Sequence, residues 1–159
     1  MEQRDKTLIL GIGNILLRDE GAGIHALNHL RTLLAHRDDV CLLDGGTLSF
    51  ALAGDIEDAT RLIVIDAAQI NAVPGASQVF EGAEMDAFIG GNRRMSVHEV
   101  SLIDLLAIAH LSDHLPQQRA LIGIQPGEID WGESPSAAVA ATLPQVCHQA
   151  LQLLEAWHA

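Results

Sequence analysis

Apolar runs of strand length alternate along this chain with segments of helical periodicity. The clearest apolar runs are residues 7–13, 40–44, 61–66 and 119–124. Between the first two runs, residues 20–35 repeat apolar side chains every three or four positions, which is typical of an amphipathic helix. A β-α-β order of this kind predicts a mostly parallel sheet with helices on both of its faces.

Weaker patterns fill in the remainder of the predicted fold. Residues 77–81 alternate as an edge strand does. We predict further helices over residues 48–54, with Thr47 as the N-cap, and over residues 96–110 and 136–156. Three segments lack a strong pattern and are expected as loops at one end of the sheet, provided that its strands are parallel. They are residues 67–76, 82–95 and 126–135.

The composition limits which classes of protein this chain can belong to. The chain has 159 residues and 48% hydrophobic residues, which predicts one domain over residues 1–159 with a real core. A formal net charge of −12 repels phosphate backbones, so we expect no nucleic-acid partner. No apolar run reaches membrane-spanning length and no signal peptide is visible, so we expect a cytoplasmic protein without membrane insertion. No interface pattern stands out, and we expect a monomer.

The two cysteines, Cys41 and Cys147, lie far apart in apolar segments. They form no C-x-x-C pair of the kind that binds metals or exchanges disulfides. We interpret them as buried free thiols in a reducing compartment.

Polar residues stand at the carboxyl ends of the predicted strands, and open α/β sheets bind their ligands at these ends. Asn14, Asp44, Asp66 and Gln125 stand at these ends. An acid such as Asp66 at the end of a buried strand is unfavourable unless it is paired, hydrated or bound to a cation. Glu20 stands four residues before Ile24, in line with the buried stripe of the first helix, so we expect its side chain over the sheet end.

His98 completes a candidate metal site. Ser96 and Glu99 around it match a capping box, which places His98 in the first turn of a helix, where the dipole keeps the imidazole neutral. Two carboxylates and one neutral imidazole suit a borderline divalent metal. The structural alternatives stay open: a helix-start acid at position 20, a loop cap at position 66 and a surface histidine at position 98.

Several familiar enzyme signatures are absent. The chain has no H-E-x-x-H zinc motif and no G-x-S-x-G nucleophile elbow. The G-x-G at Gly11 and Gly13 invites a dinucleotide interpretation, but Leu16 stands where the third glycine belongs. A Rossmann-like nucleotide-binding domain is therefore only a minor alternative.

Four segments taken together resemble the [NiFe]-hydrogenase maturation endopeptidases. They are GIGNILLRDEGAG (residues 11–23), DGGT (residues 44–47), IDA (residues 65–67) and SVHEVSL (residues 96–102). The resemblance covers almost the whole chain, and it implies a three-layer αβα sandwich. It also implies removal of a C-terminal extension from the hydrogenase large-subunit precursor, after nickel has been inserted.

The same resemblance assigns roles to individual residues. Glu20, Asp66 and His98 match the nickel-contacting positions of the family, and Asp44 matches another characteristic acid near the cleft. The Ni²⁺ is implied to arrive with the substrate, held by the cysteine thiolates of the precursor, and other divalent ions could occupy the site in vitro.

The cleavage chemistry is left open by the sequence. The nickel could polarise the scissile carbonyl or lower the pKa of a water. Alternatively it only positions the substrate, and a carboxylate activates the water; Glu20, Asp44 and Asp66 are the candidate catalytic residues. A non-catalytic module that binds nickel-loaded precursor is the alternative from another functional class.

Overall fold

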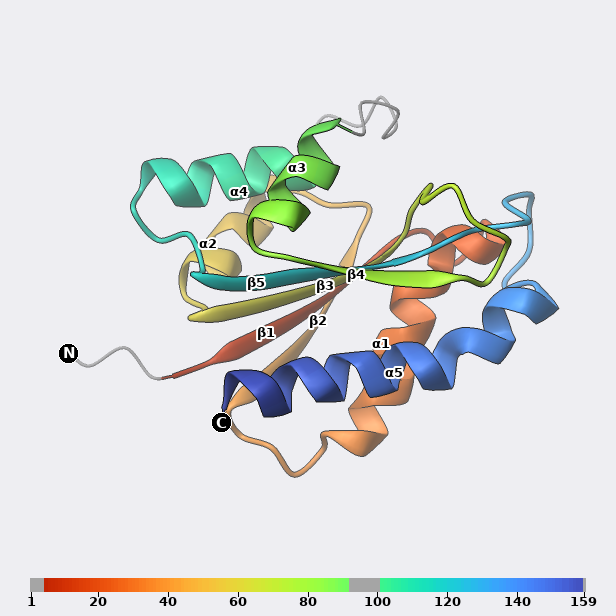
Figure 1. Ribbon diagram of the computed structural model, residues 1–159, viewed down its shortest axis with the longest axis horizontal. Helices are drawn as coiled ribbons and strands as arrows, with labels where there is room; N and C mark the ends of the chain where they lie inside the picture. Colours follow the sequence, from red (N-terminus) through yellow and green to blue (C-terminus); the bar gives the residue numbers. More distant parts are fainter. Residues whose placement is uncertain (1–4, 92–100, 159) are drawn as a thin grey trace.

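The computed structural model describes residues 5–91 and 101–158, which form a five-stranded sheet with helices on both faces (Figure 1). The strands are β1 (Thr7–Ile12), β2 (Val40–Gly46), β3 (Arg61–Ala67), β4 (Ser77–Glu81) and β5 (Gln118–Ile124). The helices are α1 (Ala22–Leu33), α2 (Ala53–Glu57), α3 (Ala83–Gly91), α4 (Leu102–Leu111) and α5 (Ala137–Trp157), with 3-10 turns η1 (Arg18–Gly21) and η2 (Phe50–Leu52). The strand order is β2-β1-β3-β5-β4, and only β4 is antiparallel to its neighbour.

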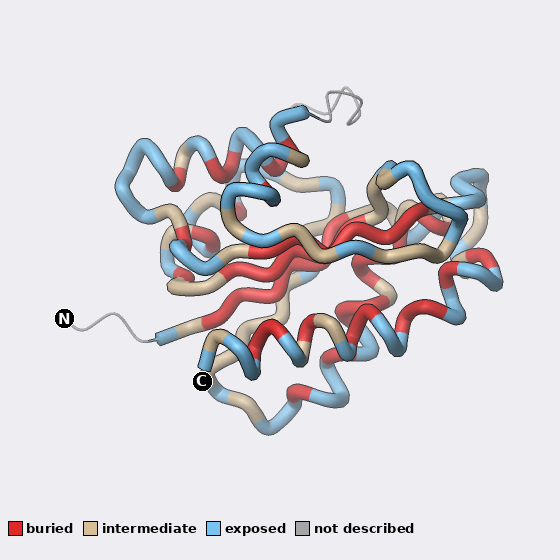
Figure 2. The backbone as a smooth tube through the Cα atoms, viewed as in Figure 1, coloured by how far each residue is buried: buried red, intermediate tan, exposed pale blue. Residues whose placement is uncertain are grey.

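The central strands are buried from both sides, as Figure 2 shows. Because successive strand residues point to opposite faces, each strand supplies two cores. Ile9 and Ile63 pack with α1 and α5, whereas Leu8 and Leu62 pack with α2, α3 and α4. Figure 1 shows the same division, with α1 and α5 below the sheet and the other three helices above it. The predicted three-layer αβα sandwich is confirmed.

The five predicted strands are present, and the buried stripe of the first helix is confirmed. Ile24, Leu27, Leu30 and Leu34 are all buried. The helix itself begins later than predicted, at Ala22, because η1 precedes it. Glu20 therefore lies in a 3-10 turn rather than in the first turn of α1.

Two local predictions need correction. The segment after β2 forms η2 followed by α2; the N-cap position of η2 is Ser49 and not Thr47, and the Ser49 side chain makes no capping hydrogen bond. The helix predicted over residues 96–110 begins at Leu102, after a capping box made by Ser101 and Asp104. The capping box predicted at Ser96 and Glu99 lies outside the described residues.

Because β4 is antiparallel to β5, the three segments that were expected as loops do not all lie at the same end of the sheet. Glu81, the last residue of β4, pairs with Ala120 near the start of β5, so residue 82 lies at the amino edge of the parallel strands. Helix α3 follows at once, where a loop was expected, and Arg119 of β5 binds Asp86 on it with nitrogen–oxygen distances of 3.0 and 2.5 Å. Residues 67–76 and 126–135 do begin at the carboxyl edge, after β3 and β5.

Two further expectations concern the thiols and the membrane. Cys147 is buried, Cys41 is half-buried, and neither forms a disulfide. Within the described residues, no helix is both long enough and apolar enough to cross a membrane.

Candidate functional site

The connection after β1 folds back against the turn that carries Glu20. The Asn14 N–H donates to the Glu20 carbonyl at 3.2 Å, and the Gly13 N–H donates to the Gly46 carbonyl at 2.8 Å. A Cβ at Gly13 would lie 1.9 Å from the Glu20 carbonyl oxygen, and the φ of Gly13 is +142°. Position 13 therefore requires glycine if η1 is to sit this close to the end of β1.

The start of α1 also lacks bulky side chains, as the glycines in this segment predict. A Cβ at Gly21 would lie 2.8 Å from the Ile15 Cα, and Gly23 touches the backbone of Ile65 directly. These contacts bring η1 over the end of β3. The structure thus explains why the chain alternates glycine with small residues immediately after Glu20.

Asp66 is the buried acid of this region, with only 7% of the residue exposed. Burial raises the pKa of the Asp66 carboxyl well above its usual value, and the negative charge of Glu20 raises it further. A hydrogen bond from the Ala67 backbone opposes this rise but does not cancel it. Glu20 and Asp66 are therefore close enough to repel each other, and either a proton or a cation would relieve that repulsion.

Asp44 lies on a different part of the carboxyl edge. Its residue is exposed, and its Oδ1 accepts a hydrogen bond from the Gly46 N–H at 2.8 Å. The residue pairs with Gly11, which pairs on its other side with Ile65, so β1 separates Asp44 from β3. With about 4.8 Å between neighbouring strands, the backbone of Asp44 is roughly 10 Å from that of β3.

His98, the third predicted ligand, lies outside the described residues. Within residues 5–91 and 101–158, no three His, Cys, Asp or Glu side chains gather into a group that could hold a metal ion. The described part of the predicted triad is the pair of Glu20 and Asp66.

Asp19, the acid beside Glu20, does not cap α1. The N-cap of α1 is Gly21, which has no side chain. Asp19 is instead completely buried and binds the segment between β5 and α5. Burial would raise the pKa of its carboxyl, but hydrogen bonds from Glu128, Ser136 and Gly127 outweigh this effect and lower the pKa.

His25 is a second residue whose position the sequence did not reveal. The Nε2 of His25 is buried and has no hydrogen-bond partner among the described residues. That nitrogen would lie 3.3 Å from a Cβ at Gly21, beside η1. Burial lowers the pKa of His25, and the charge of His29 lowers it further, so the ring is neutral at pH 7.

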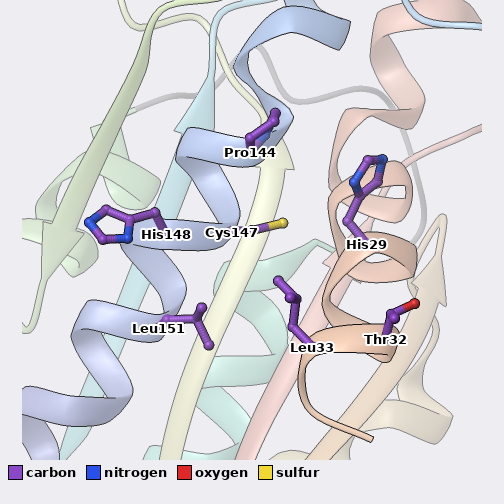
Figure 3. A pocket seen from close by; sticks show the side chains of 7 residues that line it. All are labelled: His29, Thr32, Leu33, Pro144, Cys147, His148 and Leu151. Carbon is purple, nitrogen blue, oxygen red and sulfur yellow. The ribbon is translucent and has the colours of Figure 1, made fainter.

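A hollow lies away from this edge, between α1 and α5 (Figure 3). It measures about 440 Å³, and Cys147 points toward it. The other lining residues are His29, Thr32, Leu33, Pro144, His148 and Leu151. Neither Glu20 nor Asp66 lines this hollow.

The dinucleotide alternative finds no support in the strand exit. That fingerprint needs a helix to open directly after the glycines, so that its N-terminus can hold a pyrophosphate. Here α1 begins only at Ala22, and the backbone of η1 fills the space over Gly13.

Comparison with known proteins identifies the family of this chain. A family model described as "Hydrogenase maturation protease" matches residues 24–153. The hydrogenase expression/formation protein HupD of Rhizobium leguminosarum bv. viciae is 36% identical over 153 residues, which are 96% of this chain and 75% of HupD. The hydrogenase 2 maturation protease of Escherichia coli (strain K12) is 30% identical over 151 residues, covering 94% of this chain and 90% of that protein.

Solved structures agree with these sequence matches. The hydrogenase maturating endopeptidase HybD from E. coli superposes with a TM-score of 0.83 at 29% identity, over 94% of this chain and 92% of that one. The [NiFe] hydrogenase maturation protease HybD from Thermococcus kodakarensis gives a TM-score of 0.75 at 30% identity, over 93% and 98%. The resemblance seen in the sequence motifs is confirmed, and the chain belongs to the hydrogenase maturation protease family, a family of peptidases.

Proposed function

We propose that this protein is an endopeptidase that removes the C-terminal extension of a [NiFe]-hydrogenase large-subunit precursor after nickel insertion. In this proposal the nickel held by the precursor is the recognition element. Membership of the maturation protease family supports the type of reaction. The observation that carries the nickel dependence is the pair of Glu20 and Asp66, two acids brought close together at the carboxyl edge of the sheet.

The energetics of this pair favour a cation that comes with the substrate. Ionising Asp66 beside Glu20 is unfavourable, as the raised pKa of Asp66 indicates. A precursor with bound Ni²⁺ would place positive charge between the two carboxylates and turn repulsion into attraction. A precursor without nickel would leave that repulsion in place, so the two forms of the substrate would differ in docking free energy.

The described helices are compatible with His98 as the third nickel contact. Asp66 shares its strand face with Leu62 and Val64, which pack on the layer of α2, α3 and α4. Helix α4 belongs to this layer and leads into β5, so it runs antiparallel to β5 and begins toward the carboxyl edge. The described start of α4 therefore lies on the side of the sheet that Asp66 faces.

The protein's own groups supply the proton transfers of peptide hydrolysis. When bound, the substrate nickel would supply a Lewis acid beside the scissile bond. Asp44 is exposed, so its carboxylate can take a proton from an attacking water. The protonated Asp44 can then give that proton to the leaving amine, while Asp66 contacts the nickel as an ionised carboxylate. Glu20 is the alternative base.

The test is processing of a purified precursor by single variants. Glu20→Gln, Asp66→Asn and His98→Ala should each slow cleavage of nickel-loaded precursor by more than the ~10–100-fold that loss of outer-shell residues costs at metal sites. Glu155→Gln, on the exposed surface of α5, is the matched control and should cleave normally. Normal cleavage by all three site variants would contradict the site assignment.

The same assay separates a protease from a binding module. Nickel-loaded and nickel-free precursor are incubated with the wild-type protein alone, and the precursor mass is followed. A protease shortens only the loaded form. A module binds the loaded form in a pull-down and leaves its mass unchanged, which would contradict the proposal.

A further inference from the structure

A buried carboxylate ties the η1 turn to the segment of residues 126–136. Asp19 is 0% exposed and accepts four hydrogen bonds from that segment. Its Oδ2 accepts from the N–H groups of Gly127 and Glu128, both at 2.8 Å. The Ser136 hydroxyl donates to Oδ2 at 2.8 Å, and the Ser136 N–H donates to Oδ1 at 2.7 Å.

Backbone contacts reinforce the same junction. The Asp19 N–H donates to the Glu128 carbonyl, and the Arg18 N–H donates to the Gly132 carbonyl, both at 2.9 Å. The Gly132 N–H returns a hydrogen bond to the Leu16 carbonyl at 2.9 Å. The Arg18 guanidinium pairs with the Glu128 carboxylate at 2.7 Å. Segments more than a hundred residues apart in the chain thus form one rigid unit.

The turn that bears Glu20 has little support of its own. No side chain caps η1 or the start of α1. Arg18 has a φ of +45°, a left-handed conformation that is unfavourable for a non-glycine residue. A strained turn persists only where its surroundings hold it, and here residues 126–136 hold η1 together with the exit of β1 at Gly13 and Asn14.

We propose that Asp19 is a positioning residue for the peptidase reaction. Its carboxylate fixes η1 on the 126–136 segment, and this fixes Glu20, the next residue, relative to Asp66. The inference rests on the proposed function of Glu20 and extends it to a residue that touches no substrate. Misplacing a reacting group by about 1 Å can cost 100-fold in rate, so the anchor matters to catalysis as well as to folding.

A double-mutant cycle distinguishes positioning from simple stabilisation. Cleavage of nickel-loaded precursor is measured under single-turnover conditions for wild type, Asp19→Asn, Glu20→Gln and the double variant. We expect Asp19→Asn to slow cleavage ~10–100-fold, and the double variant to be no slower than Glu20→Gln alone. An equal loss in both backgrounds would show that Asp19 does not act through Glu20.

The four rates also separate this inference from the proposed function. A normal rate for Glu20→Gln would reject the site itself, and the positioning role with it. A normal rate for Asp19→Asn beside a slow Glu20→Gln would reject only the positioning role. If Glu20→Gln has no measurable cleavage rate, the same double-mutant cycle is measured with the Kd for Ni²⁺ binding to each protein in the absence of precursor. Asp19→Asn should then weaken Ni²⁺ binding about tenfold with Glu20 present and leave it unchanged without Glu20.

Two further variants keep the test valid if Asp19→Asn does not fold. Ser136→Ala removes one donor to Asp19 and should slow cleavage several-fold, whereas Ser136→Thr keeps the hydroxyl and should restore the rate. Asp86→Asn is the matched control, because it removes a carboxylate that binds Arg119 at the opposite edge of the sheet. It should lower stability without slowing cleavage more than twofold. A rate for Ser136→Ala equal to that of Ser136→Thr would overturn the inference.

Discussion

A Cβ placed on Gly23 would lie 2.1 Å from the carbonyl oxygen of Ile65, so the first turn of α1 is in direct contact with the end of β3. Ile65 immediately precedes Asp66, and Gly23 follows Glu20 by three positions. The contact thus joins the two elements that carry the proposed carboxylate pair. Only a residue without a side chain permits such an approach of helix to strand.

Replacing Gly23 with alanine should therefore destabilise the protein, although alanine favours helices. The added methyl group must move α1 away from β3, and overpacking of this kind costs about 1–3 kcal/mol. We expect a lower urea midpoint and an unchanged slope. Cleavage of precursor should slow as well, because the displacement separates Glu20 from Asp66.

Gly54→Ala is the matched control for this substitution. Gly54 lies in α2, and nothing lies within 4 Å of a Cβ built there. Alanine should raise the free energy of unfolding by roughly 0.5–1 kcal/mol through helix propensity alone. Equal midpoints for Gly23→Ala and Gly54→Ala would show that the contact with Ile65 is not tight.

Much of this fold could be predicted because burial leaves a clear pattern in the sequence. Strands β1 and β3 are covered on both faces, so they read as continuous apolar runs. The direction of β4 could not be read, because an alternating edge strand has the same pattern in either orientation. That one ambiguity misplaced residue 82 and the helix that follows it, α3 (Ala83–Gly91).

The site shows the same division between local and long-range signals. Glu20 and Asp66 could be placed at one edge because each follows or opens an apolar element. The partners of Asp19 could not be predicted, since Gly127 and Ser136 lie over a hundred residues later and carry no pattern that points back. The meeting of His98 with the two carboxylates stays a prediction, because His98 lies outside the described residues.

Asp66→Asn should stabilise the protein at neutral pH. The pKa of Asp66 is raised in the folded state, so the folded protein binds more protons than the unfolded chain above the ordinary pKa of 3.8. The contribution of Asp66 to the free energy of unfolding is therefore greatest below pH 3.8, and it falls as the pH rises toward the pKa of the folded state. The asparagine variant lacks this loss, so its advantage in Tm should grow from about pH 4 upward.

The control for the pH experiment is Asp55→Asn, because Asp55 is exposed on α2. Its Tm, measured over the same pH range, gives the effect of removing one exposed carboxylate. A Tm difference for Asp66→Asn that does not change with pH would mean that Asp66 is not held in an unfavourable ionised state.

Ni²⁺ added to the free protein should stabilise it through the same two carboxylates. A ligand that binds only the folded state raises stability by RT ln(1 + [L]/Kd), about 2.7 kcal/mol at a hundredfold excess over Kd. We expect a rise in Tm at pH 7 that chelator reverses, with a much smaller effect of Mg²⁺. Glu20→Gln and Asp66→Asn should lose most of the shift, while Glu155→Gln keeps it. A shift of equal size in all variants would place the bound ion elsewhere.

The two thiols should differ in reactivity. Cys147 is 3% exposed, its Sγ lies 3.7 Å from the Ala26 carbonyl, and burial raises the pKa of its thiol. Because the thiolate is the reacting form, both effects slow attack on a thiol reagent. Cys41 is only half-buried on the edge strand β2. We expect Cys41→Ser to remove a fast labelling phase and Cys147→Ser to remove a slow phase. The slow phase should be at least about tenfold slower than the fast one. Urea should accelerate the slow phase, because it opens the contact of α5 with α1. Equal labelling rates for the two single variants would contradict the packing of Cys147 between these helices.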